Sequence, residues 1–85
     1  MNNFEYKNKF VMNWNKYDVK DWINDVAREK EMADCGDLFE NQNIDGTKLW
    51  DIKSYEKLKQ MGIPSVGLKL TIFKKIETSV GDYYQ

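Results

Sequence analysis

The sequence predicts an all-α fold, a bundle of five helices in which three short central helices precede a long C-terminal helix. Apolar residues recur three and four positions apart along several stretches, which is the spacing of a helix with one buried face. Residues that cap helices stand before most of these stretches, and glycine and proline separate the last two. The 85 residues correspond to one small domain, so most of the large apolar residues are expected in its core.

The N-terminal segment, residues 1–13, is rich in asparagine and lysine. Its apolar residues stand at even spacings: Phe4, Tyr6, Phe10 and Met12. This alternation is compatible with a short strand, but we expect an arm that lies loosely on the domain and is partly disordered, with an ordered part near residues 10–13. The domain itself is expected over residues 14–80, followed by a frayed tail at residues 81–85.

The first helix is expected over residues 18–30. Asp18 is predicted to cap it, because its carboxylate can accept hydrogen bonds from the free amides of the first turn. Asp21 follows three residues later, where a capping box places its acidic residue. The predicted core face repeats at i, i+3, i+4 and i+7: Val19, Trp22, Ile23 and Val26.

The second and third helices are expected to be short. Polar residues 41–43 end the second helix, and Asp45 is predicted to cap a very short third helix that carries Leu49 and Trp50. Trp50 is expected to be at least half-buried, and the alternative is that it anchors a partner protein. The second helix has an i, i+3, i+4 core face: Cys35, Leu38 and Phe39.

The last two helices have clear boundary signals. Ser54 is predicted to cap the fourth helix, and Gly62 stands where a left-handed residue ends it. Pro64 prevents continuation, and Ser65 is predicted to cap the last helix, over residues 65–79. The residues expected to face inward are Tyr55, Leu58 and Met61 in the fourth helix, and Ile72, Phe73, Ile76 and Val80 in the last.

The composition argues against catalysis and metal binding. The chain has no histidine and a single cysteine, Cys35, so neither a zinc site of the usual kinds nor a Ser-His or Cys-His pair is expected. No glycine-rich phosphate-binding motif is present, and no pair of carboxylates stands out by its spacing. We therefore expect no enzymatic activity, no catalytic residues, no cofactor and no metal ion.

The sequence also bears on cellular location. Cys35 cannot form a disulfide within the chain and is expected to be a buried, inert thiol, which favours a reducing, intracellular and cytoplasmic setting. No apolar run approaches the roughly 20 residues that a membrane helix needs. The first ten residues have no apolar stretch typical of a signal peptide.

Five motifs, in order and at matching distances, resemble those of the sterile alpha motif (SAM) domain. Trp14 and residues 18–23 (DVKDWI) are similar to the family's opening, in which a tryptophan precedes D-V-x-x-W-[LI]. Residues 39–46 (FENQNIDG) are similar to F-x-x-x-x-I-D-G. Three further motifs follow: residues 49–52 (LWDI) at the family's L-L-x-L, residues 58–63 (LKQMGI) at L-K-x-[LM]-G-[IV], and residues 67–72 (GLKLTI) at G-x-[RK]-x-x-I.

The resemblance covers residues 14–78 and implies the SAM-like bundle of five helices. Trp50 replaces a smaller aliphatic residue of the family, and Leu70 stands where many members carry a charged or polar residue. Most of the motif residues are core residues in the family. They therefore indicate the fold, and the function has to be argued from the surface.

SAM domains mostly bind other SAM domains, so the resemblance implies a protein-interaction module whose partner is a second SAM domain, homotypic or heterotypic. The family's common contact joins a mid-loop surface, on the second to fourth helices, to an end-helix surface at the start of the fifth. Such head-to-tail pairing supports oligomers or polymers and scaffold roles in signalling. The expected mid-loop residues are Asp37, Glu40, Asp45 and Asp51. The expected end-helix residues are Val66, Gly67, Lys69 and Leu70.

The charges of the chain are divided between the same two regions. Residues 31–52 contain six acids and one lysine, a net charge of −5, whereas residues 66–76 contain three lysines and no acid, a net charge of +3. The whole chain has a net charge of only −1. Opposite charges on two surfaces favour their association. The alternative interpretation is that these charges only decorate the surface.

The last helix carries a second indication of an interface. Helical spacing places Lys69 on the core side, so its side chain must snorkel or the helix start must project from the body. The same spacing places Leu68 and Leu70 on opposite flanks, so we expect one of them to be exposed beside Val66. The alternative is that both leucines pack under the N-terminal arm.

The alternative function within the family is binding of an RNA hairpin through a basic cluster around the start of the last helix. Lys69 lies there, but the neighbouring regions are acidic and the isoelectric point is about 5.4. This composition disfavours a phosphate ligand. A membrane-surface role is disfavoured as well, because the first helix mixes basic with acidic residues.

Overall fold

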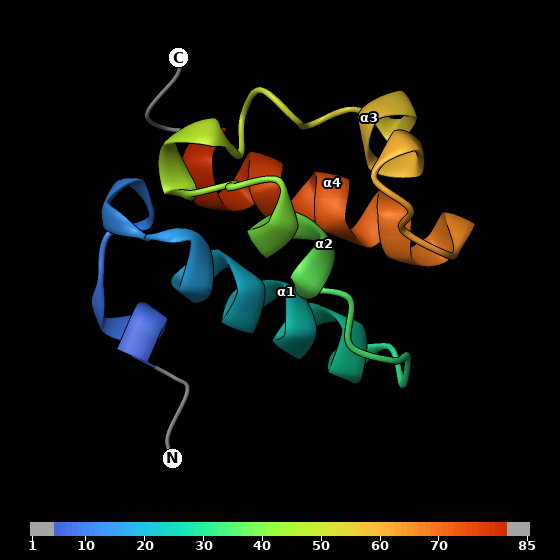
Figure 1. Ribbon diagram of the computed structural model, residues 1–85, viewed down its shortest axis with the longest axis horizontal. Coiled ribbons are helices and arrows are strands. Elements are labelled where there is room, and N and C mark those ends of the chain that lie inside the picture. The colour runs from blue at the N-terminus through green and yellow to red at the C-terminus, as the bar shows by residue number, and fades with distance from the viewer. Residues whose placement is uncertain (1–4, 82–85) are drawn as a thin grey trace.

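The computed structural model describes residues 5–81, which form helices and turns and contain no strand (Figure 1). The α-helices of this range are α1 (Lys16–Glu29), α2 (Asp37–Asn41), α3 (Tyr55–Gln60) and α4 (Val66–Val80). The 3₁₀ helices are η1 (Glu5–Asn8), η2 (Val11–Asn13) and η3 (Gly46–Lys48). The all-α class is confirmed, but the expected count of five α-helices is not, because the third expected helix is η3. Phe4 and residues 82–85 of the expected tail lie outside the described residues.

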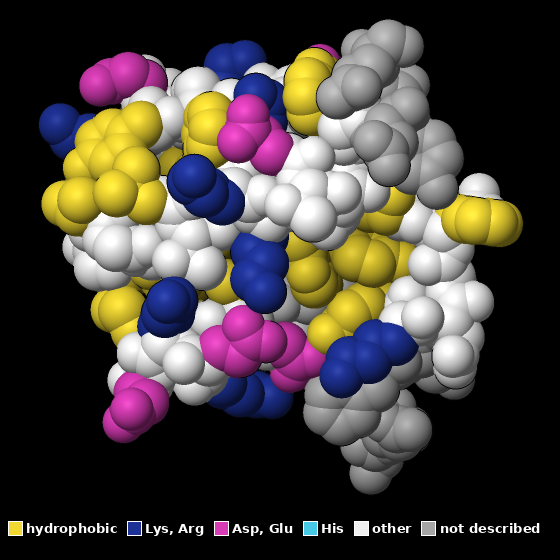
Figure 2. All heavy atoms as spheres, turned by 180° about the vertical axis from the view of Figure 1, so that it is seen from behind, with side chains coloured by type: hydrophobic (Ala, Val, Ile, Leu, Met, Phe, Trp, Pro, Cys, Tyr) yellow, Lys and Arg dark blue, Asp and Glu magenta, His cyan; other side chains and the backbone are white. Residues whose placement is uncertain are grey.

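The two long helices, α1 and α4, pack against each other. α2 packs on α1, and α3 packs on α4. In Figure 1, α3 and the start of α4 lie at one end of the molecule, whereas η1 and η2 lie at the other. Figure 2 shows the opposite side, where charged side chains of both signs surround recessed apolar surface.

One continuous apolar core joins these elements. The expected core faces of α1 and α4 are confirmed, except that Phe73 is only partly buried. Cys35 is buried as expected, and its burial raises the pKa of the thiol. The largest completely buried side chains come from all four α-helices and the segment after η3: Ile23, Phe39, Leu49, Leu58, Leu68, Ile72 and Ile76.

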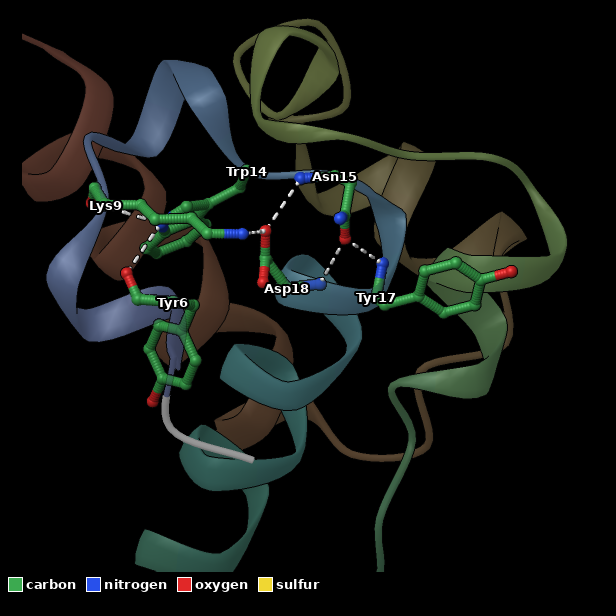
Figure 3. A network of polar contacts seen from close by, with 6 residues as sticks. All are labelled: Tyr6, Lys9, Trp14, Asn15, Tyr17 and Asp18. Atoms are coloured by element: carbon green, nitrogen blue, oxygen red, sulfur yellow. Dashed lines mark hydrogen bonds and ion pairs between the residues drawn. The ribbon is translucent and has the colours of Figure 1, made fainter. Parts of the chain in front are cut away.

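The N-terminal segment forms two turns, so the strand alternative is wrong for residues 5–13. The buried Tyr6 ring meets the Trp14 ring edge to face, with the ring centroids 5.2 Å apart. The Trp14 indole N–H donates to the Tyr6 carbonyl oxygen at 2.9 Å (Figure 3). The Tyr6 hydroxyl donates to the Asp25 carboxylate. Phe10, in the same segment, is 71% exposed.

The start of α1 differs from the prediction. The side-chain oxygen of Asn15 accepts hydrogen bonds from the backbone N–H groups of Tyr17 and Asp18, both at 2.9 Å. Asp18 accepts in turn from the Asn15 backbone N–H at 3.0 Å, which completes a capping box (Figure 3). The prediction that Asp18 caps the helix and Asp21 reciprocates is therefore wrong. The helix begins at Lys16, two residues earlier than predicted, which puts Asn15 at the N-cap and Asp18 at the third helical position of the capping box.

The short element after α2 is capped as predicted but is not an α-helix. The Asp45 carboxylate accepts a hydrogen bond from the Thr47 backbone N–H at 3.0 Å. The backbone hydrogen bonds of this element join residues three apart, which defines a 3₁₀ helix. One example is the 3.1 Å bond from the Lys48 N–H to the Asp45 carbonyl oxygen. Gly46 packs directly on η2, because a Cβ there would stand 1.7 Å from the Val11 carbonyl oxygen.

The starts of α3 and α4 are confirmed. Ser54 and Ser65 cap them, and each hydroxyl oxygen accepts a hydrogen bond of 2.9 Å from the backbone N–H three residues later. Gly62 has the expected positive φ, 97°. Leu58 is buried, but Tyr55 is 37% exposed, so its predicted inward position is wrong. Tyr55 is the first residue of a helix of six residues, and its ring therefore lies at the edge of the core.

Candidate protein-docking surfaces

The start of α4 exposes an apolar surface. Val66 is 58% exposed and Leu70 is 52% exposed, and their spacing of four places them on one face of the helix. Gly67 lies beside them, where a Cβ would meet nothing within 4 Å. We call these three residues the α4 tip. Leu68 is buried, so the expectation of one exposed leucine beside Val66 is confirmed and packing of both leucines under the arm is wrong.

Lys69 does not belong to the α4 tip. The residue is only 6% exposed, and its ammonium group donates a hydrogen bond to the Ile63 carbonyl oxygen at 3.2 Å. The same nitrogen lies 5.2 Å from the centre of the Tyr55 ring, within cation–π range. Lys69 thus lies on the core side of α4, as its spacing predicted, and its charge is held at the junction of α3 and α4. The structure separates it from the other three expected end-helix residues.

Two of the expected mid-loop acids lie on α2 and share one partner. The Lys20 ammonium group on α1 stands 3.1 Å from the Asp37 carboxylate and 3.0 Å from the Glu40 carboxylate. The hydrogen bonds to Glu40 and Asp37 raise the pKa of Lys20. These ion pairs are at least partly exposed and contribute little to stability. They do neutralise part of the charge that the sequence assigns to the mid-loop surface.

The other two mid-loop acids differ from each other. Asp45 accepts from both the backbone N–H and the hydroxyl group of Thr47, so its carboxylate serves the start of η3. Asp51 is exposed, and its carboxylate has no ion pair with any residue in the described part of the chain. It stands at a shallow groove with the partly buried apolar residues Ile52 and Met61. We call this the mid-loop groove.

The separation of charge is weaker in space than along the sequence. Arg28 binds the Asp34 carboxylate with two hydrogen bonds, at 2.7 and 2.9 Å, which lower the pKa of that carboxyl group. On α4, Lys75 pairs with Glu29 at 3.4 Å. Arg28 and Glu29 both belong to α1, so this helix supplies a base to one region and an acid to the other. Lys74 is exposed and has no ion pair with a described residue.

Trp50 is partly buried against the core, so the expectation of at least half burial is confirmed. The Lys53 ammonium group lies 4.4 Å from the centre of the Trp50 ring and 4.7 Å from that of Phe73. Packing within the domain therefore accounts for this residue. Its alternative role as an anchor for a partner has no separate support.

The structure also reveals a groove between α1 and α4 that the sequence analysis missed. Trp22 lines it from α1, and Leu70, Lys74 and Thr78 line it from α4. The last three are spaced by four, which places them along one side of that helix. The spacing was visible in the sequence, but the contribution of Trp22 depends on how α1 and α4 pack. We call this the α1–α4 groove.

The described residues contain no group of three histidine, cysteine, aspartate or glutamate side chains arranged to hold a metal ion. Within residues 5–81, no helix has both the length and the apolar character needed to cross a bilayer. The features that stand out are surfaces: the α4 tip, the mid-loop groove and the α1–α4 groove. Together with the helical fold, they define a small domain suited to protein interaction.

Comparison with known proteins identifies the family of this domain. The family model of the SAM domain (sterile alpha motif) matches residues 11–78, and the chain belongs to this family. It is also similar to the WD repeat, SAM and U-box domain-containing protein 1 of Danio rerio, with 31% identity over 67 residues. That match covers 79% of this chain and 13% of the relative, so the chain spans about an eighth of the relative's length. No solved structure matches the chain significantly. SAM domains are generally interaction modules without enzymatic activity.

Proposed function

We propose that this SAM domain binds a second SAM domain head to tail, with the α4 tip of one domain in the mid-loop groove of the other. The observation that carries the proposal is the pair of half-exposed apolar side chains, Val66 and Leu70, on one face at the start of α4. Clustered apolar side chains of this kind are typical of interaction sites.

The mid-loop groove has the chemistry to receive the α4 tip. Ile52 and Met61 offer apolar surface. Asp51 lines the groove together with Lys57, whose ammonium group donates to the Asp51 carbonyl oxygen at 2.6 Å. The N-terminus of α4 carries partial positive charge from its free amides, which favours a nearby carboxylate. Gly67 leaves that end of the helix open, because it has no side chain there. Apolar contact and charge therefore act together.

The revised geometry changes the roles of the expected residues. Asp51 becomes the principal mid-loop acid, because Asp37 and Glu40 already pair with Lys20 and Asp45 caps η3. The positive charge of the end-helix surface is the partial charge of the α4 N-terminus, since the Lys69 ammonium group is held inside. The two surfaces are different patches, so each identical chain that joins leaves one surface free for the next. Such head-to-tail contacts build a ring or an open filament. A different SAM partner would give a heterotypic complex.

Two complementary variants test this proposal. Val66→Glu places a carboxylate in the α4 tip, where a first-turn acid suits the helix dipole and the fold is retained. Asp51→Lys reverses the charge of the mid-loop groove. Light scattering over a range of concentrations should show that the unmodified domain associates, that each variant alone is a monomer, and that a mixture forms one-to-one dimers through the remaining intact surfaces.

A matched control is Asn8→Asp, which adds the same single negative charge at an exposed site of the N-terminal segment and should leave association intact. A monomeric unmodified domain at millimolar concentration would rule out self-association. Unchanged association of Val66→Glu would rule out the α4 tip as the docking surface. The RNA-hairpin alternative is not favoured, because Lys69, the lysine on which it depended, is withdrawn from the surface.

A further inference from the structure

The α1–α4 groove lies apart from the mid-loop groove and runs along α4 from Leu70 towards Ser79. The face of the molecule turned away in Figure 1 shows recessed apolar surface bordered by basic and acidic side chains (Figure 2). Nine residues separate the two ends of the groove along α4, a length of about 14 Å at 1.5 Å per residue. An extended chain of about four residues, at roughly 3.3 Å each, spans that distance.

The apolar part of the groove combines one buried and one exposed residue. Trp22 is only 7% exposed and packs on Trp14, with their ring centroids 5.3 Å apart, so its position is firmly held. Leu70 is 52% exposed at the other side. A large apolar side chain placed between them would cover Leu70 and contact the accessible part of the indole. The gain would come from apolar area removed from water.

Trp22 also offers an unused donor. Its indole N–H has no hydrogen-bond partner among the described residues. Buried side-chain nitrogen and oxygen atoms in the described part of the chain all have partners, so this N–H is accessible to solvent, and Trp22 lines both the α1–α4 groove and a neighbouring hollow on the Asp25 side of α1. A backbone carbonyl oxygen of a bound segment is the simplest acceptor for it.

The polar lining of the groove is basic. Lys74 and Lys75 both line it, and no acidic residue does. Lys75 already pairs with Glu29 at 3.4 Å, but Lys74 has no ion pair with a described residue. Thr78 adds a hydroxyl group, which donates to the Lys74 carbonyl oxygen at 3.0 Å and keeps lone pairs for another donor. The site therefore complements a ligand that is acidic and apolar at once.

We propose that the α1–α4 groove binds a short, extended, acidic segment of a partner protein that carries one large apolar side chain. The apolar side chain packs between Trp22 and Leu70, and a carboxylate pairs with Lys74. A nucleic acid fits less well, because one free lysine in the groove falls short of the row of cations that a phosphate backbone needs. This surface shares Leu70 with the α4 tip, but its other lining residues lie outside the proposed SAM–SAM contact.

The test uses a defined probe, a synthetic peptide with the sequence Glu-Asp-Phe-Glu-Asp-Gly and blocked ends. A ¹H–¹⁵N NMR titration at a concentration where the domain is monomeric should shift the Trp22 indole N–H signal and the amide signals of residues 70–79. Lys74→Glu should weaken binding at least tenfold. The matched control is Lys59→Glu, the same charge reversal at an exposed site on α3, which should change the dissociation constant less than twofold.

Several outcomes would overturn the proposal. These are absence of shifts at millimolar peptide, shifts centred on the mid-loop groove, equal weakening by Lys59→Glu, and equal binding of a peptide in which lysines replace the acids. Stronger shifts of the same signals by a short RNA hairpin or by anionic lipid vesicles would also count against it. Val66→Glu, which should abolish SAM pairing, should leave peptide binding unchanged, so the two proposals can fail independently.

Discussion

The starts of the two long helices use the same local device but have different surroundings. At α1, Asn15 caps the helix, Asp18 completes the capping box, and Lys9 from the preceding turn pairs with Asp18 at 3.0 Å. At α4, Ser65 caps the helix, yet the α4 tip that follows is exposed. The N-terminal turns cover the first start, whereas at the second the Ser65 hydroxyl contacts the Met32 sulfur but the apolar side chains of the α4 tip stay exposed.

This difference suggests that the start of α1 serves the stability of the domain and the start of α4 serves its association. At the start of α1, burial of Tyr6 and Trp14 adds apolar area to the core of a small domain, which gains much from each large side chain. At the start of α4, Leu68 and Lys69 are buried, whereas Val66 and Leu70 are not core residues. Substitutions near α1 should therefore change the free energy of unfolding, and substitutions in the α4 tip should change association.

The largest effect is expected for Trp14→Ala. This change removes the edge contact with Tyr6, the contact with Trp22 and the indole hydrogen bond to the Tyr6 carbonyl oxygen. We expect a loss of about 3–5 kcal/mol in the free energy of unfolding, measured by urea denaturation. Phe10→Ala, four residues earlier and highly exposed, should change it by less than about 0.5 kcal/mol. Similar losses for both would mean that the N-terminal turns do not stabilise the fold.

The next largest effect concerns Lys69, which is buried at the start of α4. Lys69→Met keeps the length of the side chain but leaves the Ile63 carbonyl oxygen without the donor that the ammonium provides. The expected loss is about 1–3 kcal/mol in the free energy of unfolding. Lys74→Met, at an exposed site on the same helix, should stay within about 0.5 kcal/mol of the unmodified domain. A neutral Lys69→Met would show that this lysine is available for docking after all.

The two caps provide a smaller, direct comparison. Asn15→Ala and Ser65→Ala should each cost about 1 kcal/mol. The Asn15 oxygen accepts from two backbone N–H groups and Asp18 accepts from the Asn15 N–H, whereas the Ser65 oxygen accepts from one. Asn15→Ala should therefore be the costlier change in chemical denaturation. The reverse order would mean that the cap of α4, rather than that of α1, limits stability.

The smallest effect concerns Tyr6, whose contribution to the free energy of unfolding changes only at alkaline pH. Burial, together with the hydrogen bond to Asp25 and nearby carboxylates, raises the pKa of Tyr6 above its ordinary value of 10.0. The folded state therefore holds the phenol proton more tightly than the unfolded state. The resulting stability is complete below pH 10 and is lost as the pH rises through the folded-state pKa.

Tyr6→Phe isolates this contribution, because other groups titrate in the same range in both proteins. The difference in unfolding free energy between the unmodified domain and Tyr6→Phe should be constant from pH 7 to 9 and should shrink above pH 10. A difference that grows with pH would mean that the Tyr6 phenol ionises more readily in the folded state, contrary to its buried contact with Asp25.

Local patterns in the sequence determined the helical class, the caps at Ser54 and Ser65, the left-handed Gly62 and the core face of α4. Each of these depends on residues within one or two turns of each other, and hydrogen bonds and burial at that range follow the spacing. The exposed leucine beside Val66 was predictable for the same reason. The count of α-helices was not, because η3 is too short for spacing to distinguish a 3₁₀ turn from a helix.

Tertiary structure decided the features that join distant residues. Lys9 from the N-terminal turns pairs with the buried Asp18, and counting charges overestimated the acidity of α2 because Lys20 on α1 neutralises part of it. Lys69 lies on the core face by its spacing, but only the packing of α3 against α4 supplies the Ile63 oxygen that retains its charge. Burial and ion pairing act through space, and the sequence order of the partners does not encode that distance.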